Sequence, residues 1–266
     1  MDKRAVTNQQ VKDILIKQMQ KIKKWYQRYK NNPYQPKNIH QLRVHLRKLR
    51  SLLNFIKPLI EDKSYQLLNE NLKEIAKQLS PVREVDVLLK ECNKIAKAQP
   101  QLTEHYADLF HFLEKSRLNL IKRVSTKKAF SYFEDLIQET EIILDDLSFD
   151  LGSVSTDDLT TFFENRFIHK KEKLEKSFKN MEKDNYENVH DIRKQAKKIR
   201  YVAEVFKKWL PGSTRKELAR KAKELQDDLG EYTDAYVNLQ MFKDYKMKTN
   251  SEKLIEAFDQ LNDYYS

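Results

Sequence analysis

The scarcity of glycine constrains the fold of this chain more than any other feature of its sequence. Only three glycines (Gly152, Gly212 and Gly230) and six prolines occur among 266 residues. A sheet of many strands needs frequent tight turns, and glycine and proline are the residues that make them. The rest of the sequence is rich in Lys, Leu and Glu, which favour helices. We therefore predict an all-α protein.

Prolines and short polar segments divide the sequence into stretches of helical length, including a long predicted helix over residues 38–57. Proline is tolerated in the first turn of a helix but not in its interior. Four prolines accordingly mark predicted helix boundaries: Pro58, Pro81, Pro100 and Pro211. Small and acidic residues at positions 145–156 interrupt the helical pattern, so we place the division of the chain there. The predicted halves are residues 1–150 and 151–266.

Charge narrows the choice of partner. Lysine plus arginine (51) exceed aspartate plus glutamate (40), which leaves a formal net charge of +11. Such a surplus favours an anionic partner, but nucleic acid, an anionic membrane surface and a phosphate polymer all satisfy it. A basic surface that is simply solvated satisfies it as well, so the net charge alone does not name the partner.

The cysteine content and the hydropathy of the sequence indicate the cellular compartment of the protein. Cys92 is the only cysteine, which excludes an internal disulfide and a zinc site built from several thiolates. No run approaches the roughly 18–20 apolar residues of a membrane-spanning helix, and the N-terminal sequence turns polar too soon for a signal peptide. We expect a soluble protein of the cytoplasm.

The sequence contains an internal repeat. Residues 39–57 align without a gap on residues 189–207 at an offset of 150 positions. The matching basic positions are His40 with His190, Arg43 with Arg193, Arg47 with Lys197, Lys48 with Lys198, Arg50 with Arg200 and Lys57 with Lys207. Residues 73–87 align on residues 223–237 at the same offset. We predict a duplicated helical unit whose two copies are related by a pseudo-twofold axis.

The matched cations lie on one face of each predicted helix. At about 100° per residue, four of them in each half fall within an arc of roughly 80°. The first stripe is His40, Arg43, Arg47 and Arg50, and the second stripe is His190, Arg193, Lys197 and Arg200. Lys48 and Lys198 lie about 80° away from their stripes. The neighbouring arcs are predicted to be buried: Leu42, Leu46, Leu49, Leu53 and Ile56, and Ile192, Ala196, Ile199, Ala203 and Phe206.

The spacing of the stripes suits an extended polyanion. At 1.5 Å per residue the first stripe spans roughly 15 Å, enough to meet several successive phosphates. Arginine binds phosphate with a planar fork, lysine acts as a point charge, and histidine donates a hydrogen bond when neutral. Unpaired like charges at these spacings weaken a helix by a few tenths of a kcal/mol per pair. A solvated face explains one basic run, but not its recurrence in both halves.

These motifs are similar to those of a known family, the CHAD domain. The family's helix pattern, H-x-x-R-x-x-x-[RK]-[RK]-x-R, matches residues 40–50 and again residues 190–200. The segments LSPVREVDVLL from Leu79 and LQDDLGEYTDAYV from Leu225 resemble the turn and helix start that follow in each half. Two positions depart from the pattern. Glu84 stands where Asp or Asn is usual, and Thr233 stands opposite Arg83, which puts a symmetrical role for that arginine in doubt.

The resemblance implies a pair of helical bundles around a pseudo-twofold axis, with the stripes lining a shared surface or channel. It also implies inorganic polyphosphate as the ligand, bound without chemistry. The E-x-E-x-K strand of the triphosphate-tunnel enzymes fused to some relatives does not occur in this sequence. The residues expected to bind the polymer are His40, Arg43, Arg47, Lys48, Arg50, Lys57, His190, Arg193, Lys197, Lys198, Arg200 and Lys207. Association with polyphosphate granules, regulation of an enzyme and scaffolding are all compatible with such binding.

Catalysis and metal binding find little support in the sequence. The other histidines are expected to be structural: His45, His105, His111 and His169. A phosphoryl acceptor or a metal site at His40 or His190 is disfavoured, because a metal needs carboxylate or thiolate ligands and the stripes supply cations. We expect no enzymatic activity, no cofactor and no metal.

Nucleic-acid binding is the alternative function. Lys/Arg-rich helices hold DNA or RNA backbones through the same release of counterions. Four aromatic residues near basic positions could stack on bases, but we expect them to pack in the interior: Trp25, Tyr26, Tyr29 and Tyr201. Two further basic segments, Lys170 to Lys179 and Arg215 to Lys223, are interpreted as solvated helix faces.

Overall fold

The computed structural model describes residues 6–99, 106–149, 159–182, 184–207 and 233–265, together with residues 209, 220, 229 and 230. Every regular element in these ranges is a helix, which confirms the all-α prediction. The elements are α1 (Asn8–Asn31), α2 (Pro36–Ile56), the 3-10 helix η1 (Lys57–Leu59), α3 (Asp62–Gln78), α4 (Ser80–Ala98), α5 (Tyr106–Val124), α6 (Lys127–Asp145), α7 (Thr160–Lys179), α8 (Tyr186–Val205) and α10 (Glu252–Tyr265). Residues 233–246 are helical as well.

Prolines stand where the sequence predicted helix boundaries. Pro58 lies in η1, directly after the end of α2, and Pro81 lies in the first turn of α4. The helix predicted over residues 38–57 is observed as α2, within two residues at its start and one at its end. Pro100 and Pro211 fall outside the described residues. Two of the four predicted boundaries are therefore confirmed, and the other two stay predictions.

The helices that carry the stripes begin in different ways. Pro36 occupies the first turn of α2, where its missing N–H would have had no partner within the helix. In α8 the cap is Asn185, whose side-chain oxygen accepts a hydrogen bond from the backbone N–H of Asn188 at 3.2 Å. Both starts fix the register of the helix, and therefore the direction in which its stripe points.

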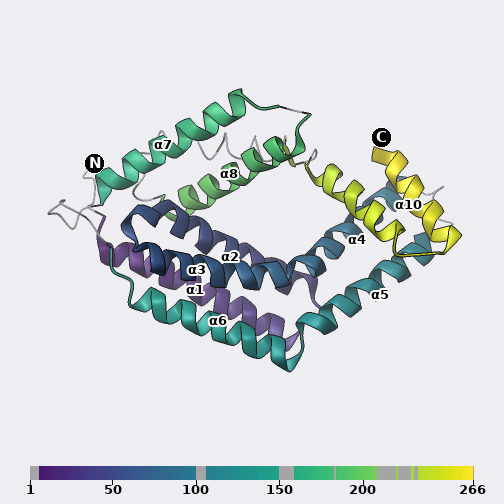
Figure 1. The fold of residues 1–266 in the computed structure, drawn as a ribbon, viewed down its shortest axis with the longest axis horizontal. Helices are drawn as coiled ribbons and strands as arrows, with labels where there is room; N and C mark the ends of the chain where they lie inside the picture. Colours follow the sequence, from purple (N-terminus) through teal and green to yellow (C-terminus); the bar gives the residue numbers. More distant parts are fainter. Residues whose placement is uncertain are drawn as a thin grey trace.

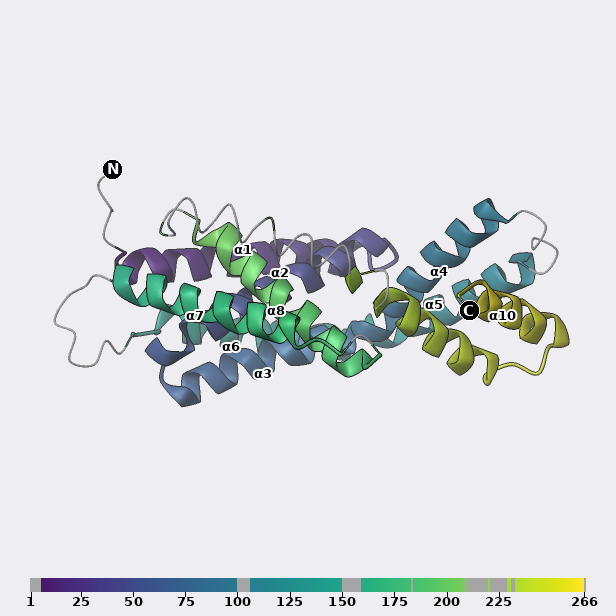
Figure 2. The same ribbon diagram turned by 90° about the horizontal axis from the view of Figure 1, so that it is seen from above.

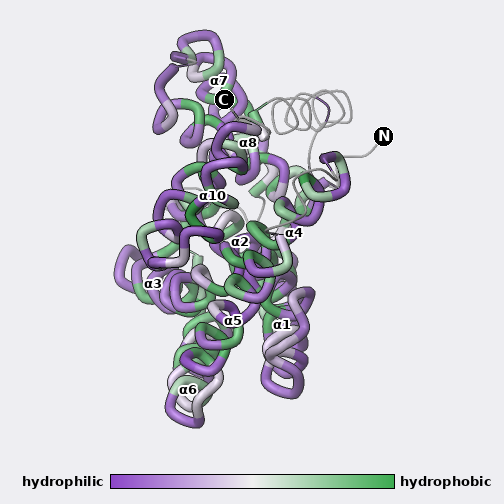
Figure 3. Tube along the Cα trace, turned by 90° about the vertical axis from the view of Figure 1, so that its right-hand side faces the viewer, coloured by the Kyte–Doolittle hydropathy of each residue, from purple (hydrophilic) through white to green (hydrophobic). Residues whose placement is uncertain are grey.

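The larger hydrophobic core lies among α1, α2, α3, α6, α7 and α8 (Figure 1). All ten residues predicted to line the buried arcs of the two stripe helices are buried there. Figure 3 shows hydrophobic and hydrophilic residues alternating along the helices, as expected of amphipathic segments. The packing of α2 directly against α8 places the two stripe helices side by side.

A smaller core closes the other end of the elongated molecule. It is formed by the C-terminal part of α4, by α5, by residues 233–246 and by α10 (Figure 2). Cys92 is fully buried in it, and burial raises the pKa of its thiol to about 12. Each of the two cores draws residues from both sides of residue 150. The backbone N–H of Val6 also donates to the hydroxyl of Thr160 at 3.2 Å, which joins the start of α1 to the start of α7.

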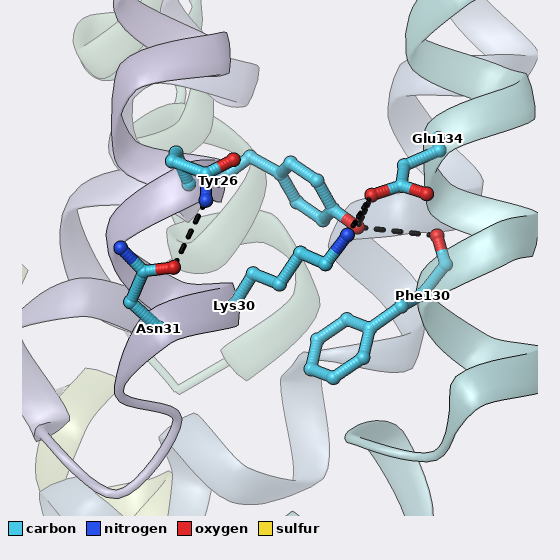
Figure 4. Close-up of polar contacts among 6 residues, drawn as sticks. Tyr26, Lys30, Asn31, Phe130 and Glu134 are labelled. Carbon is cyan, nitrogen blue, oxygen red and sulfur yellow. Dashed lines mark hydrogen bonds and ion pairs between the residues drawn. The ribbon is translucent and has the colours of Figure 1, made fainter.

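Two of the aromatic residues predicted to pack in the interior, Tyr26 and Tyr29, are buried, whereas Trp25 is only partly buried, with the guanidinium of Arg28 4.5 Å from its ring centroid. Tyr26 and Tyr29 of α1 are buried against α6, and burial raises the pKa of Tyr29 to about 12. Figure 4 shows Tyr26 reaching across to α6, where its hydroxyl donates to the carbonyl of Phe130 at 3.1 Å. Lys30 extends from the next turn of α1 to Glu134, with 2.5 Å between Nζ and Oε1. These tyrosines offer no face for stacking on a base.

Hydropathy along the helices argues against a membrane-spanning role for any of them. Among the described residues, none of the helices is both long enough and apolar enough to cross a bilayer.

Candidate anion-binding site

The two stripes meet between α2 and α8. Arg47 of the first stripe is close enough to Lys197 of the second to lower the pKa of that lysine. Arg50 acts in the same way on Lys198. Since the paired residues are 148 or more positions apart in the chain, only the folded structure creates this concentration of charge.

A cavity of about 580 Å³ lies between the stripes, and we call it the central cavity. Seven of the residues around it are arginine or lysine and none is a carboxylate, among those the structure describes. Its lining is Arg43, Arg47, Arg50, Ser51, Asn54, Tyr65, Asn69, His190, Arg193, Lys194, Lys197, Lys198 and Tyr201. Such a lining attracts anions and repels cations.

A smaller hollow of about 220 Å³ lies on the other side of the first stripe. The three arginines of that stripe line it together with Lys73, Ala76, Lys77 and Ser80. The first stripe therefore stands between two basic depressions, with α8 beyond one and α3 beyond the other.

Arg43 is held by neutral partners on the neighbouring helices. Its Nη1 donates to the hydroxyl of Ser80 at 2.7 Å and to the carbonyl of Ala76. Its Nε is buried and has no hydrogen-bond partner in the described part of the chain. Burial, followed by the nearby charge of Arg47, lowers the pKa of Arg43 to about 10, while Glu84 opposes that shift. Arg43 keeps its full positive charge at neutral pH.

The other two arginines of the first stripe differ in how firmly they are held. Arg50 donates from Nε to the side-chain oxygen of Asn69 at 3.0 Å, and burial lowers its pKa. Arg47 is exposed, and its guanidinium has neither a hydrogen bond nor an ion pair with any residue described. Arg47 is thus the arginine whose donors are available to a ligand.

One arginine of the second stripe binds a carboxylate side chain. Arg193 binds Asp234 through two parallel contacts, of 2.9 Å from Nη1 to Oδ1 and 3.3 Å from Nη2 to Oδ2. His190 stacks on Tyr186 with 5.3 Å between ring centroids, and Tyr186 stacks in turn on Tyr236 at 3.7 Å. This arrangement fixes the orientation of the histidine ring at the edge of the central cavity.

Lys197 has the most strongly shifted pKa among the lysines of the site. Burial lowers it to about 8, and the charges of Arg193 and Arg47 contribute, while Asp234 acts in the opposite direction. Burial and then Arg50 lower the pKa of Lys198. The shifts record the free energy that burial, and then the neighbouring like charges, cost the protonated form of each lysine.

With this geometry in view, the chain was compared with known proteins. The family model described as the CHAD domain matches residues 13–243. This chain belongs to the CHAD domain family. The match confirms the resemblance seen in the sequence motifs. A comparison with curated proteins gave no match.

Solved structures show the same fold for this CHAD domain. The crystal structure of the CHAD domain from the plant Ricinus communis is similar with a TM-score of 0.77 and 18% sequence identity, over 100% of this chain and 87% of that chain. PptA from Streptomyces chartreusis is similar with a TM-score of 0.70 and 12% identity, over 97% of this chain and 93% of that chain. At such identities the likeness establishes the fold.

Seven of the twelve predicted binding residues of this CHAD domain line the central cavity, and five lie outside its lining. The five are His40, Lys48, Lys57, Arg200 and Lys207. Lys48 and Arg200 share one carboxylate, that of Glu204, at 3.0 Å and 3.5 Å. Both also lie over the ring of Tyr201. Lys57 is exposed in η1 and lies 3.4 Å from Asp62.

The two stripe histidines occupy similar electrostatic surroundings. Burial lowers the pKa of His40, and Arg83, Arg47 and Arg43 add to the effect. Burial and then Lys194 lower the pKa of His190. Both shifts favour the neutral imidazole, which can donate one hydrogen bond.

Structural roles account for the other histidines that the structure describes. His45 accepts at Nδ1 a hydrogen bond from the side-chain amide nitrogen of Gln18 at 2.8 Å, and burial lowers its pKa to about 4. His111 and His169 are exposed, and His105 lies outside the described residues. Within the described ranges, no three His, Cys, Asp or Glu side chains are grouped as metal ligands.

The two positions that depart from the family's pattern, Glu84 and Thr233, can be explained by their contacts. The hydroxyl of Thr233 is buried and donates to the carbonyl of Leu229 at 2.8 Å, so it caps a turn and does not replace the charge of Arg83. Glu84 raises the pKa of Arg43, and Asp234, 150 positions later, binds Arg193. An acidic residue thus accompanies the second position of each stripe.

Sequence reasoning missed several residues of the site. Lys194 and Asn69 line the central cavity, and Lys73 and Lys77 line the smaller hollow. Lys73 and Lys77 are four residues apart on α3 and so share a face, which was a usable signal. Nothing in the sequence identifies Asn69, because its role depends on the packing of α3 against α2.

Proposed function

We propose that this CHAD domain binds inorganic polyphosphate in the central cavity, without catalysing a reaction. The observation that carries the proposal is the lining of that cavity by seven arginines and lysines with no carboxylate among the described residues. A linear polyanion of closely spaced phosphates is the ligand that neutralises such a lining most completely.

Electrostatic repulsion between the cations of the two stripes supports a polyanion over a single small anion. Lys197 and Lys198 come from one helix, and the arginines that lower their pKa come in part from the other. A single phosphate group contacts a few donors at most, whereas a chain of phosphates can meet cations of both stripes at once. The cavity therefore favours a ligand that runs between α2 and α8.

Aromatic residues near the cavity disfavour nucleic acid, the alternative ligand. Binding of single strands relies on exposed aromatic faces on which bases stack. Tyr201 lines the cavity but is only 4% exposed, and Lys48 and Arg200 lie over its ring. Tyr65 is half-buried beneath Lys57. The two tyrosines in the lining of the cavity therefore offer little surface for bases.

A competition experiment tests the choice between these ligands. Labelled polyphosphate is bound to the protein and then challenged with unlabelled polyphosphate or with single-stranded RNA, at equal phosphate concentration and fixed salt. We expect displacement by polyphosphate at a concentration at least about tenfold lower than by RNA, because only the polymer of phosphates fits the cavity. Equal displacement by RNA would assign the site to nucleic acid.

We further propose that residues 1–150 and 151–266 are copies of one helical unit that face each other across a pseudo-twofold axis. The pairing of Arg193 with Asp234 and the influence of Glu84 on Arg43 recur at the same offset of 150 positions. Superposition of α2 and α4 on α8 and residues 233–246 tests this idea. A rotation far from 180° between the two pairs would contradict it.

A cellular role follows from binding alone. We propose that the protein acts in the cytoplasm and collects on polyphosphate granules where these exist. Fluorescence of a tagged protein should overlap with a polyphosphate stain, and a charge-reversed cavity variant should be diffuse. A variant that still collects on the granules would separate localisation from the central cavity.

A further inference from the structure

A second cavity, of about 360 Å³, lies beside the central cavity, and we call it the α7 cavity. Three helices build it: the last turns of α2, the middle of α7 and the exposed side of α8. Its lining is Ser51, Asn54, Phe55, Phe167, Lys170, Lys173, Asp191, Lys194, Gln195, Lys198, Ile199 and Val202. Lys170 and Lys173 belong to the basic segment that the sequence assigned to a solvated helix face.

The floor of the α7 cavity is firmly packed. Phe55 and Phe167 are 3% and 2% exposed, with 6.5 Å between their ring centroids. The carbonyl of Phe55 accepts a hydrogen bond from Nε of Arg166 at 3.0 Å, which ties α7 to the end of α2. The distance between the lysines of α7 and those of α8 is therefore set by the packed core beneath them.

Lysines crowd the rim of this cavity without a matching set of acids. Burial lowers the pKa of Lys170, and Arg166, Lys173 and Lys198 add to the effect. The one carboxylate in the lining belongs to Asp191, and it lies 3.2 Å from Lys194. Among the described residues, Lys170, Lys173 and Lys198 have no ion-pair partner within 4.0 Å. The rim has the charge of an anion-binding site.

The two cavities adjoin each other. Ser51, Asn54, Lys194 and Lys198 line both of them. Asn54 and Ser51 form the part of α2 that borders both cavities, and the side-chain amide of Asn54 can donate to phosphate oxygens, whereas the hydroxyl of Ser51 donates to the carbonyl of Arg47 at 2.8 Å. An extended chain leaving the central cavity at this point meets Lys198 first and then the lysines of α7.

We propose that the α7 cavity binds phosphate groups of the same polyphosphate chain that occupies the central cavity. This inference rests on the proposed function of the central cavity and extends it. Its consequence is a preference for length: chains confined to the central cavity lack the contacts to Lys170 and Lys173, whereas longer chains gain them.

The test compares two double variants across chain lengths. Lys170→Gln/Lys173→Gln removes the charges of the α7 cavity, and Lys171→Gln/Lys179→Gln removes two charges from the same helix outside both cavities. Affinities of the wild-type protein and both variants are measured for pyrophosphate, tripolyphosphate and chains of increasing defined length. Thermal unfolding monitored by circular dichroism shows whether each variant is folded, and glutamine retains the helix propensity of these positions.

We expect the wild-type affinity to rise with chain length and then reach a plateau. Lys170→Gln/Lys173→Gln should bind long chains about tenfold more weakly and short chains unchanged, while the control pair stays within about twofold for all lengths. The dependence of log affinity on log salt concentration should become shallower by about 1.4 for long chains, at roughly 0.7 per lost contact to a single strand.

Three results would overturn the proposal. Equal weakening by both double variants would assign the effect to net charge. Equal weakening of short and long chains would place these lysines in the central site. Binding of two pyrophosphates to the wild-type protein, but of one to Lys170→Gln/Lys173→Gln, would make the α7 cavity a separate anion site.

The outcome for the wild-type protein separates this inference from the proposed function. Tight binding that does not depend on chain length overturns the role of the α7 cavity and leaves the central cavity in place. Failure of the wild-type protein to bind polyphosphate of any length overturns both.

Discussion

The first and second stripes share one sequence pattern but meet different partners in the structure. Arg43 is held by the hydroxyl of Ser80 and the carbonyl of Ala76, both of which are neutral groups. Arg193, its counterpart, is bound at both nitrogens by the carboxylate of Asp234. The shared pattern thus determines the positions of the cations on each helix. The partners on the neighbouring helix determine how far each cation is available to a ligand.

A second contrast lies one turn further along each stripe. Arg47 is exposed, and arginine side chains as a class are permanent cations. Lys197, its counterpart, is half-buried and has a pKa of about 8. The first stripe therefore supplies constant charge, and the second supplies charge that depends on pH and on a neighbouring acid.

Reversal of the charge of the exposed arginine, Arg47, should have the largest effect on polyphosphate binding. Arg47 lines both the central cavity and the smaller hollow, and its donors are available to a ligand. Arg47→Glu should weaken polyphosphate binding by roughly a hundredfold, about 2.7 kcal/mol. Isothermal titration calorimetry against Lys24→Glu, an exposed change of equal charge on α1, provides the measurement and its control. Similar losses in the two variants would deny Arg47 a place in the site.

The second-largest effect concerns the stability of the fold. Arg43 and Arg193 stand at equivalent positions, but the groups that they bind differ in burial. Arg43→Ala should lower the free energy of unfolding by about 2 kcal/mol, since it removes a partly buried guanidinium that donates to Ala76 and Ser80 and leaves a space in its place. Arg193→Ala should lower it by less than about 1 kcal/mol, because the Asp234 side chain is 59% exposed. Urea unfolding of the two variants measures the difference. The reverse order would contradict the assignment of Arg43 to a structural as well as a binding role.

The pH dependence of binding should come from the second stripe. A bound phosphate chain favours the charged form of Lys197, so affinity is highest below the pKa of about 8 and falls as the pH rises through it. Between pH 7 and pH 9 we expect a loss of up to about tenfold, or 1.4 kcal/mol, for one lysine. Lys197→Arg should abolish most of this dependence. A profile that stays steep in Lys197→Arg would assign the titration to another group.

The smallest effect is expected from the acid of the second stripe. Asp234→Asn removes the carboxylate that competes with phosphate for Arg193, so polyphosphate should bind about two- to fivefold more tightly. Glu84→Gln, at the equivalent position of the first half, is the matched comparison. A larger gain from Glu84→Gln than from Asp234→Asn would reverse the contrast between the stripes.

Local sequence rules predicted the helices well, and the reason is physical. The period of apolar residues and the few prolines specify helix faces and ends without reference to the rest of the chain, as Leu42, Leu49 and Pro58 show. The same rules located the first stripe, whose three arginines all line the central cavity.

Placing residues at about 100° each around the helix axis predicted the lining of the cavity less well for the second stripe. It placed Arg200 on the stripe and Lys198 away from it, whereas Lys198 lines the central cavity and Arg200 lies beside Glu204, outside the lining. A wheel gives directions around one helix axis, but the face that meets the cavity depends on how α8 crosses α2. That crossing is set by contacts between residues far apart in the sequence, as is the position of Asn69 beside Arg50.

The link between Val6 and Thr160 has a consequence for the order of folding. It closes a loop of 154 residues, and the larger core contains residues from Val6 to Leu229. Contacts so distant along the chain form late, because the entropy of closing long loops opposes them and slows folding. During synthesis, α1 to α6 are therefore made before α7 and α8. The apolar surface against which α7 and α8 later pack is then still exposed to water. We expect this interval, in which the emerging chain is half built, to be the one in which a chaperone is needed.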